Sequence, residues 1–245
     1  MLEKARGLAA DEVVVDLEDG VAPADKELAR EHAVRSGLAA LRVNARGTAW
    51  WEDDLRAAAD GGFGVVVLPK VESPEDVAAA AERLPAGVGL EAQIETARGL
   101  VEVERIAAAG HGLEALVFGP GDFAASLGVP TLTIGGGASD YALARIAVAA
   151  RAFGLQAVDG PWARLDDEAG LRESARRALA LGYDGKWVIH PSQIEPVREV
   201  FTPSPEEVAR AERLLAAEGA ARDGGEMVDA ASRKLAEALL ARARR

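Results

Sequence analysis

The sequence has 245 residues, of which 49% are hydrophobic and 28% are charged, so it is typical of a globular chain rather than a disordered one. Its formal net charge of −12 argues against nucleic acid or an anionic membrane as a partner, because both would repel the chain at long range. The absence of cysteine excludes disulfides, thiolate nucleophiles and cysteine-based zinc sites. The chain starts without an apolar leader and has no run of about 18 apolar residues, which predicts a cytoplasmic protein.

Short apolar runs alternate along the chain with longer segments of helical period. The predicted strands are 12–17, 41–44, 65–69, 89–94, 115–118, 155–158 and 186–190. The predicted helices are 2–9, 25–39, 51–60, 74–83, 97–109, 139–153 and 167–181, and two C-terminal helices over 204–217 and 227–243. Residues 219–225 begin and end in glycine and predict a flexible link between the last two helices.

This alternation of strands and helices predicts an α/β fold with a parallel sheet covered on both faces. The chain length matches the roughly 250 residues of one (β/α)8 TIM barrel. A doubly wound open sheet is the alternative, but acidic residues follow strands along the whole chain, and only a barrel brings all strand ends to one mouth. Seven strands are predicted, so a closed barrel needs one more strand before residue 12. We therefore predict a catalytic barrel domain over 1–200, with its first strand missing from this chain, and a helical extension over 201–245.

Two carboxylates follow consecutive predicted strands. Glu95 comes directly after strand 89–94, and Asp122 follows strand 115–118 after a Gly-Pro-Gly turn. They are one strand–helix unit apart, so we expect them to be neighbours at the barrel mouth. Carboxylate oxygens suit Mg²⁺ or Mn²⁺, and Mg²⁺ commonly takes one or two of them together with water and substrate. The pair is the best candidate metal site; the alternative is that each acid caps the helix that follows it.

A denser acidic cluster, Asp16, Glu18 and Asp19, ends the first predicted strand. Three acids in four residues repel each other unless cations or hydrogen bonds offset their charge. One interpretation is that this cluster holds metal-bound water; the other is that it is the solvated start of a loop.

Three basic side chains lie in or after predicted strands. Arg42 lies inside strand 41–44 and is predicted either to face the mouth, where it could bind a carboxylate or an oxyanion, or to form a buried ion pair with an acid. Lys70 ends strand 65–69 and is predicted to form ion pairs more readily than a Schiff base. His190 closes the last strand, where it is a candidate base or a structural residue.

Five motifs then occur in a fixed order: VDLEDGVAP at 15–23, LRVN at 41–44, LPKVE at 68–72, IETARG at 94–99 and GKWVIHPSQ at 185–193. Each one is modest, but together in this order they are highly specific. The chain resembles the citrate lyase beta-subunit-like and malyl-CoA lyase enzymes of the HpcH/HpaI aldolase superfamily. The run AVDGP at 157–161, followed by the last motif, is most similar to the malyl-CoA lyase side.

The resemblance implies a (β/α)8 barrel with C-terminal helices that forms a homo-oligomer, a trimer or hexamer, in which the extension packs on a neighbouring subunit. It implies a Mg²⁺-dependent carbon–carbon lyase that cleaves or forms a 3-hydroxyacyl-CoA, such as malyl-CoA, citramalyl-CoA or β-methylmalyl-CoA, with an acyl-CoA and a 2-oxo acid as the other reactants. The alternatives are citryl-CoA cleavage, hydrolysis of malyl-CoA by a thioesterase, a CoA-independent 2-oxo-acid aldolase, and a non-catalytic scaffold.

The resemblance also assigns roles to residues. The metal ligands of the family match Glu95 and Asp122, and its active-site arginine matches Arg42. The segment Met227-Val228-Asp229 resembles the one that supplies a catalytic aspartate to the neighbouring subunit's site. From chemistry alone Asp229 would be only a helix N-cap.

The remaining implied residues support the substrate and the metal. We expect Ile189, His190 and Pro191 to line the substrate site, and the acidic cluster at 16–19 to orient metal-bound water. Family members usually begin with a strand of the type Arg-Ser-x-Leu-x-x-Pro, which helps to bind the CoA ester. This sequence lacks that motif, which matches the strand missing from the predicted barrel.

Overall fold

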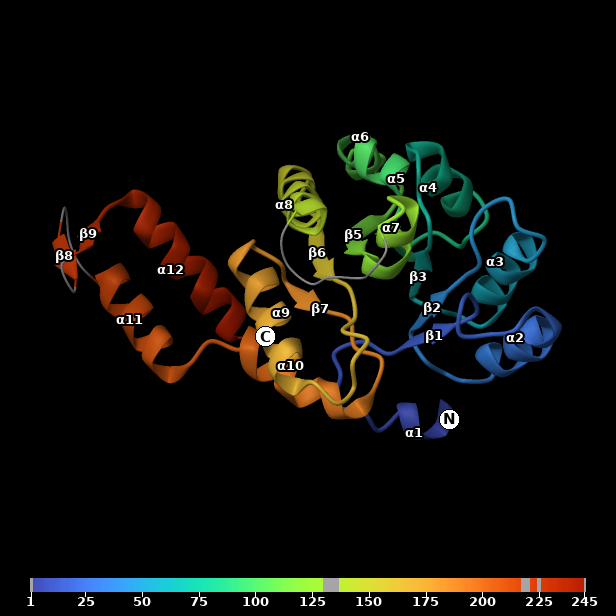
Figure 1. Ribbon diagram of the computed structural model, residues 1–245, viewed down its shortest axis with the longest axis horizontal. Coiled ribbons are helices and arrows are strands. Elements are labelled where there is room, and N and C mark those ends of the chain that lie inside the picture. Colours follow the sequence, from blue (N-terminus) through green and yellow to red (C-terminus); the bar gives the residue numbers. More distant parts are fainter. Residues whose placement is uncertain (1, 130–136, 217–220, 224–225, 245) are drawn as a thin grey trace.

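The computed structural model describes residues 2–129, 137–216, 221–223 and 226–244. Seven strands of these residues form one parallel sheet in chain order (Figure 1). The strands are β1 Val14–Asp16, β2 Ala40–Arg42, β3 Val65–Leu68, β4 Gly89–Ile94, β5 Leu113–Phe118, β6 Gln156–Asp159 and β7 Gly185–Lys186. The predicted α/β fold with seven sequential parallel strands is therefore confirmed. Within the described part of the chain β1 and β7 are the two edges, so these strands form a curled, open sheet.

Except for α1, which precedes β1, the helices follow the strands and cover the outside of the curl (Figure 1). They are α1 Leu2–Ala5, α2 Lys26–Val34, α3 Trp51–Asp60, α4 Pro74–Ala81, α5 Ala97–Val101, α6 Val103–Ala107, α7 Pro120–Ser126, α8 Gly137–Ala152, α9 Glu168–Ala180 and α10 Ile194–Phe201. Two short 3-10 helices, η1 Pro23–Asp25 and η2 Pro191–Gln193, lie in the loops.

The hydrophobic core lies between the outward face of the sheet and the helices. Leu41, Val66 and Leu90 stand opposite one another on β2, β3 and β4, and each is at most 1% exposed. Burying a side chain of this size contributes about 1.5–3 kcal/mol, so this layer fixes the register of the strands. Because side chains alternate along a strand, the neighbours of these residues point to the inside of the curl. Arg42, on β2, is one of them.

The boundaries differ from the prediction in several places: α7 was not among the predicted helices, and the predicted helices 2–9 and 25–39 end early, at Ala5 and Val34. The last strand covers only residues 185–186, and the predicted helix 97–109 is split into α5 and α6 at Glu102. Helix α10 was not predicted, because its segment contains Pro196 and follows a His-Pro pair. The start of the predicted helix 227–243 is instead the end of a short hairpin, β8 Ala221–Asp223 with β9 Glu226–Val228. The described part of the predicted flexible link is thus ordered as strand.

The C-terminal helices form a separate lobe. Helices α11 Pro205–Ala216 and α12 Ala230–Ala243 lie against each other and extend away from the sheet (Figure 1). Their shared core is small, with Ala211 and Ala236 buried, while Leu235 is 72% exposed. A lobe with so little apolar burial of its own is weakly held, which bears on its role below.

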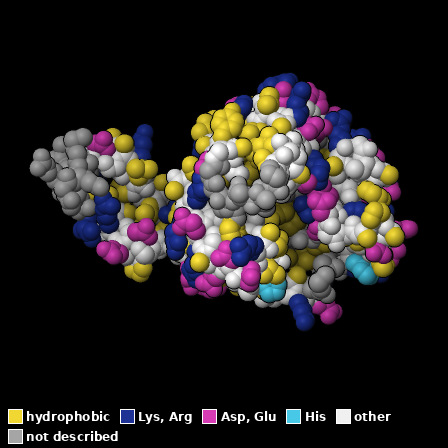
Figure 2. All heavy atoms as spheres, viewed as in Figure 1, with side chains coloured by type: hydrophobic (Ala, Val, Ile, Leu, Met, Phe, Trp, Pro, Cys, Tyr) yellow, Lys and Arg dark blue, Asp and Glu magenta, His cyan; other side chains and the backbone are white. Residues whose placement is uncertain are grey.

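The surface carries mixed charge. On the face shown in Figure 2, basic and acidic side chains alternate, and basic ones do not gather into a single patch. None of the helices in the described residues has both the length and the apolar character needed to cross a membrane.

Candidate active site

The strand ends bring the predicted polar residues together. Asp16 and Arg42 are the last residues of β1 and β2, and Glu95 directly follows β4. Lys70 is the second residue after the end of β3. Asp122 lies in the first turn of α7, the helix that follows β5. All five therefore lie at the carboxyl edge of the sheet, where parallel α/β folds place their functional groups.

Arg42 is held by the acidic cluster at the end of β1. Its Nε donates to Asp16 Oδ1 at 2.8 Å and its Nη2 to Asp16 Oδ2 at 2.7 Å, which is a bidentate pair. Its Nη1 lies 3.1 Å from Glu18 Oε2. Asp16 also accepts the backbone N–H groups of Glu18 and Gly20, so both of its oxygens are occupied. Arg42 thus forms the predicted ion pair with an acid, but the pair is half-buried rather than fully buried and lies at the carboxyl edge of the sheet.

Charge partners decide the ionisation of this pair. Burial opposes ionisation of Asp16, but the hydrogen bonds and positive charge of Arg42 outweigh it and lower the pKa of that carboxyl. Arg42 therefore favours the anionic form of Asp16, and the two hydrogen bonds between them fix the guanidinium.

Two residues that the sequence analysis did not single out complete the surroundings of Arg42. Gln93 Oε1, on β4, accepts from Arg42 Nη1 at 3.4 Å, and the Trp187 ring, just after β7, lies 5.8 Å from the guanidinium carbon. One arginine on β2 thus touches groups from the first strand, the middle and the last strand. This is direct evidence that the sheet curls around a common interior. Glu91, Gln93 and Glu95 alternate with apolar residues along β4 and just after it. This pattern could have predicted that Gln93 lies on the same side as Glu95.

Lys70 joins most of the acidic groups. Its Nζ forms a short hydrogen bond to Glu18 Oε1 and lies 3.1 Å from Asp122 Oδ2 and 3.8 Å from Asp19 Oδ2. Although burial opposes the charge, these carboxylates raise the pKa of the Lys70 ammonium. An ammonium held in this way remains protonated, so the structure favours the ion-pair prediction over a Schiff base.

Glu95 is the most buried acid of the group, only 3% exposed. Its Oε1 accepts the backbone N–H of Lys70 at 2.8 Å. Gly119 lies directly against its side chain, and a Cβ at that position would overlap the carboxylate. Burial, and then the charge of Glu18 and Asp122, raises the pKa of Glu95 to about 7, although Lys70 acts in the opposite direction. A buried carboxylate with this surplus of negative charge suits a cation.

The chemistry of these donors fits magnesium. Glu95 and Asp122 supply hard oxygen donors at one mouth, with Asp122 about one third exposed and Glu95 covered. Within the described residues no group of three or more His, Cys, Asp or Glu side chains is arranged to hold a metal ion. Two carboxylates are what Mg²⁺ commonly takes from a protein, with water and substrate completing its shell.

The turn that carries Glu18 has its own support. Buried Lys26 donates from Nζ to the carbonyl oxygens of Leu17 and Glu18 and to Asn44 Oδ1, at 2.5, 2.7 and 2.7 Å. Two of these bonds fix the backbone around Glu18, and the third ties it to Asn44, two residues after β2. Sequence reasoning missed Lys26 because it lies ten residues after Asp16, within a predicted surface helix.

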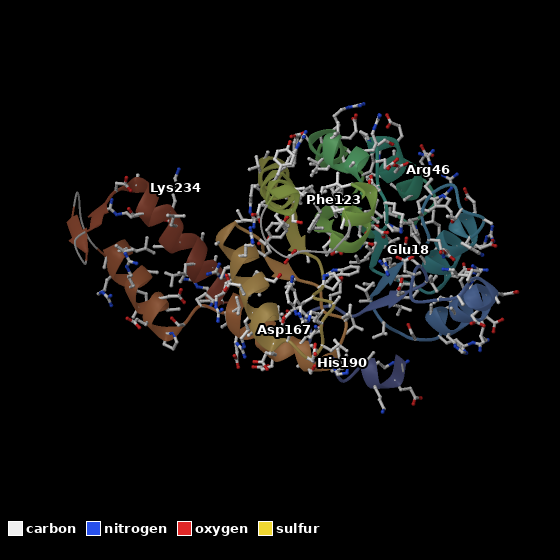
Figure 3. All side chains as sticks on the ribbon, in the orientation of Figure 1. Glu18, Arg46, Phe123, Asp167, His190 and Lys234 are labelled. Carbon is white, nitrogen blue, oxygen red and sulfur yellow. The ribbon has the colours of Figure 1, made fainter. Side chains whose placement is uncertain are left out.

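The residues expected to bind substrate lie on the loop after β7. Ile189 is 56% exposed, and His190 is exposed and caps η2, with its Nδ1 2.8 Å from Ser192 Oγ. His190 lies at the lower rim in Figure 3, apart from Glu18. Their place beside Trp187 is compatible with lining the mouth, whereas His190 has a local capping bond that agrees with the structural alternative.

Asp229 is the N-cap of α12. Its Oδ1 accepts the backbone N–H of Ser232 at 2.8 Å, and its own N–H donates to Ser232 Oγ. This hydrogen bonding lowers the pKa of its carboxyl. The lobe that carries Asp229 extends away from the sheet (Figure 1), so Asp229 is not part of the group around Arg42 in its own chain.

Comparison with known proteins agrees with this geometry. The family model described as HpcH/HpaI aldolase/citrate lyase matches residues 1–191. The chain belongs to this family. The resemblance inferred from the five motifs is therefore confirmed, and with it the assignment of the chain to a family of carbon–carbon lyases.

Three relatives illustrate how much of the chain the likeness covers. An L-malyl-CoA/beta-methylmalyl-CoA lyase of Cereibacter sphaeroides is 38% identical over 287 aligned positions, which span 99% of this chain and 90% of that protein. A (3S)-malyl-CoA thioesterase of the same species is 38% identical over 246 positions, or 97% and 85% of the two chains. The crystal structure of CitE from Mycobacterium tuberculosis with magnesium, acetoacetate and coenzyme A matches with a TM-score of 0.88 at 39% identity, covering 99% of this chain and 93% of that one.

Proposed function

We propose that this protein is a Mg²⁺-dependent lyase that cleaves or forms a carbon–carbon bond of a 3-hydroxyacyl-CoA such as malyl-CoA, citramalyl-CoA or β-methylmalyl-CoA. The products of cleavage are an acyl-CoA and a 2-oxo acid. The observation that carries the proposal is the convergence of Glu95, Asp122 and Arg42 at one mouth. The malyl-CoA lyase, similar over nearly the whole length, and the CitE complex with magnesium and coenzyme A support it.

Glu95 and Asp122 would hold Mg²⁺, or Mn²⁺, and the bound ion would polarise the hydroxyl and oxo oxygens of the hydroxy-acid end. Lys70 donates its backbone N–H to Glu95, which orients that carboxylate, and its ammonium lies 3.1 Å from Asp122 Oδ2. Glu18 and Asp19 lie on the other side of that ammonium and would orient water around the site, as would Asp16.

Arg42 would bind the negative charge that develops on the thioester oxygen when the carbon–carbon bond breaks. Asp16 and Glu18 already fix its guanidinium, so little reorganisation is needed at the moment of reaction. Asp229 from a neighbouring copy would protonate the carbon of the resulting enolate, and would remove that proton in the condensing direction. General acid–base help of this kind is worth roughly 10²–10⁴-fold in rate.

The C-terminal lobe supports an oligomer, a trimer or a hexamer. It extends away from its own sheet (Figure 1), buries little apolar surface of its own, and exposes Leu235. Docking on the barrel of a neighbouring subunit would bury that surface and bring Asp229 to a second mouth. Ile189, His190 and Pro191 would line the substrate path beside this junction.

The test is a screen of CoA thioesters with and without MgCl₂. Malyl-CoA should yield acetyl-CoA and glyoxylate only when Mg²⁺ is present, and Asp122→Asn should abolish the Mg²⁺-dependent turnover. Full activity in excess chelator would contradict the proposal. Borohydride trapping of a substrate adduct that is lost in Lys70→Ala would point to Schiff-base chemistry instead.

Hydrolysis of malyl-CoA is the second candidate. The alignment with the thioesterase spans 246 positions, close to the length of this chain, whereas the alignment with the lyase spans 287 and therefore leaves segments of the lyase without a counterpart here. The same screen separates the two activities, because a thioesterase releases free CoA and malate while a lyase releases acetyl-CoA.

A further inference from the structure

Lys70 has a backbone conformation that ordinary side chains avoid. Its φ is +52°, in the left-handed region, where a residue with a Cβ is held at a cost of about 1–2 kcal/mol. Strain of this kind persists where the surrounding contacts impose it. Here the contacts come from two directions, because the Lys70 N–H donates to Glu95 Oε1 while its Nζ reaches Glu18 and Asp122.

The conformation therefore ties one residue to both carboxylates to which the proposed function assigns the metal, with its N–H on Glu95 and its positive charge on Asp122. Lys70 Nζ lies 3.1 Å from Asp122 Oδ2, and the charge of Glu95 also acts on it. An ammonium at hydrogen-bond distance from a carboxylate and a divalent cation on the same carboxylate repel each other. Any cation that binds to Asp122 must therefore displace Lys70 from it or tolerate its charge.

We infer that Lys70 is a built-in counter-cation that sets the divalent-cation affinity of this site. This inference rests on the proposed function only in taking Glu95 and Asp122 as the metal carboxylates. Lys70 neutralises part of the charge of Glu18, Asp19 and Asp122, and so weakens the attraction that the mouth exerts on Mg²⁺. Glu18, its shortest contact, keeps the ammonium in the mouth when it leaves Asp122. The lysine is thus a positioning and affinity-setting residue, and its ammonium is not a nucleophile.

The size of the effect follows from Coulomb's law. A single charge about 4 Å from a divalent ion, at the dielectric constant of water, changes its binding by roughly tenfold or more. Lys70 is one third exposed, so the effect should be largest at low ionic strength and shrink as salt is added.

The experiment is calorimetric titration with MgCl₂ at low ionic strength, on the wild type and on two variants, Lys70→Met and Lys70→Gly. Both variants remove the ammonium and keep the N–H that binds Glu95. Glycine also tolerates the positive φ without strain, so the glycine variant can still be measured if the methionine variant does not fold. Lys234→Met, which removes the same charge from the exposed face of α12 (Figure 3), is the matched control. Asp122→Asn identifies the site, because it should abolish the binding.

Both Lys70 variants should bind Mg²⁺ about tenfold more tightly than wild type, while Lys234→Met should not. Their melting temperatures should also rise more steeply with MgCl₂, because tighter binding to the folded state stabilises it more. Wild-type binding that depends on Asp122 but is not tightened in either Lys70 variant would overturn this inference and leave the proposed function intact. Absence of Mg²⁺ binding in wild type and in both Lys70 variants would overturn both.

Discussion

The contact between Gly119 and Glu95 gives a sharp test of the candidate metal site. A methyl group at Gly119 would overlap the Cβ, the Cδ and one carboxylate oxygen of Glu95. The backbone of Gly119, with φ −104° and ψ 90°, suits alanine, so Gly119→Ala would act through this overlap and not through backbone strain. Glu95 is buried and cannot swing into solvent, so the substitution must move the carboxylate or the start of α7.

Overpacking of this kind typically costs about 1–3 kcal/mol. For a chain of this size each kcal/mol corresponds to roughly 2–4 °C in melting temperature. We therefore expect Gly119→Ala to lower the stability measurably in urea unfolding and to weaken Mg²⁺ binding in calorimetry. Both effects should occur together, because one displaced carboxylate causes both.

Gly121→Ala is the matched control. It lies two residues further along in the first turn of α7, and a Cβ there would meet no atom within 4 Å. Alanine is the better helix former by about 1 kcal/mol, so this variant should be as stable as wild type or more so, with unchanged Mg²⁺ affinity. If Gly119→Ala and Gly121→Ala behave alike, Glu95 does not occupy the position described here and the reasoning fails.

Three further predictions follow from the site and its surroundings. Removing divalent cations with a chelator should abolish turnover, and added MgCl₂ should restore it in a direct assay of product. Asp229→Asn and Glu95→Gln should each lose turnover. When both variants are co-expressed, mixed oligomers should regain part of it, because some sites then combine an intact Glu95 with an intact Asp229. Absence of any regain would exclude a cross-subunit aspartate. Burial, and then the charges of Glu12 and Glu114, raises the pKa of Glu91 to about 8. The folded state therefore retains a proton that the unfolded state releases above about pH 4.5, and stability falls as the pH rises toward 8. Glu91→Gln should remove that part of the fall, so urea unfolding should show a gain at pH 8.5 and little change at pH 5; equal effects at both pH values would contradict the assignment.

The fold was largely predictable because apolar and polar residues alternate along the strands with the period that an extended backbone imposes. The apolar residues Leu90, Ala92 and Ile94 face the helices, while Gln93, between two of them, and Glu95, directly after the strand, face the interior. Periodicity of this kind, together with acids at strand ends, is enough to predict a parallel sheet and the edge that carries the chemistry.

The partners of the site residues could not be predicted, because they depend on the curl of the sheet. Lys70 and Glu18 are 52 residues apart in the sequence, and Arg42 meets Trp187 across the whole sheet. Nothing local to Lys70 distinguishes an ion pair with Glu18 from one with Asp122, and the structure shows both. The strained φ of Lys70 is likewise a product of these distant contacts, since the sequence offers a lysine where local preference favours glycine.

The same contacts explain why acids that look equivalent in sequence divide into two kinds. Arg42 pairs with both oxygens of Asp16, and Lys70 and Arg42 both lie within ion-pair distance of Glu18, so the nearest cations to these two carboxylates belong to the protein itself. Glu95 accepts the backbone N–H of Lys70, which carries no full charge. Asp122 shares one ammonium with Glu18, across a gap that solvent reaches. The carboxylates with the least internal compensation are therefore the ones that an external divalent cation would gain most by binding, and each of them lies beside Lys70.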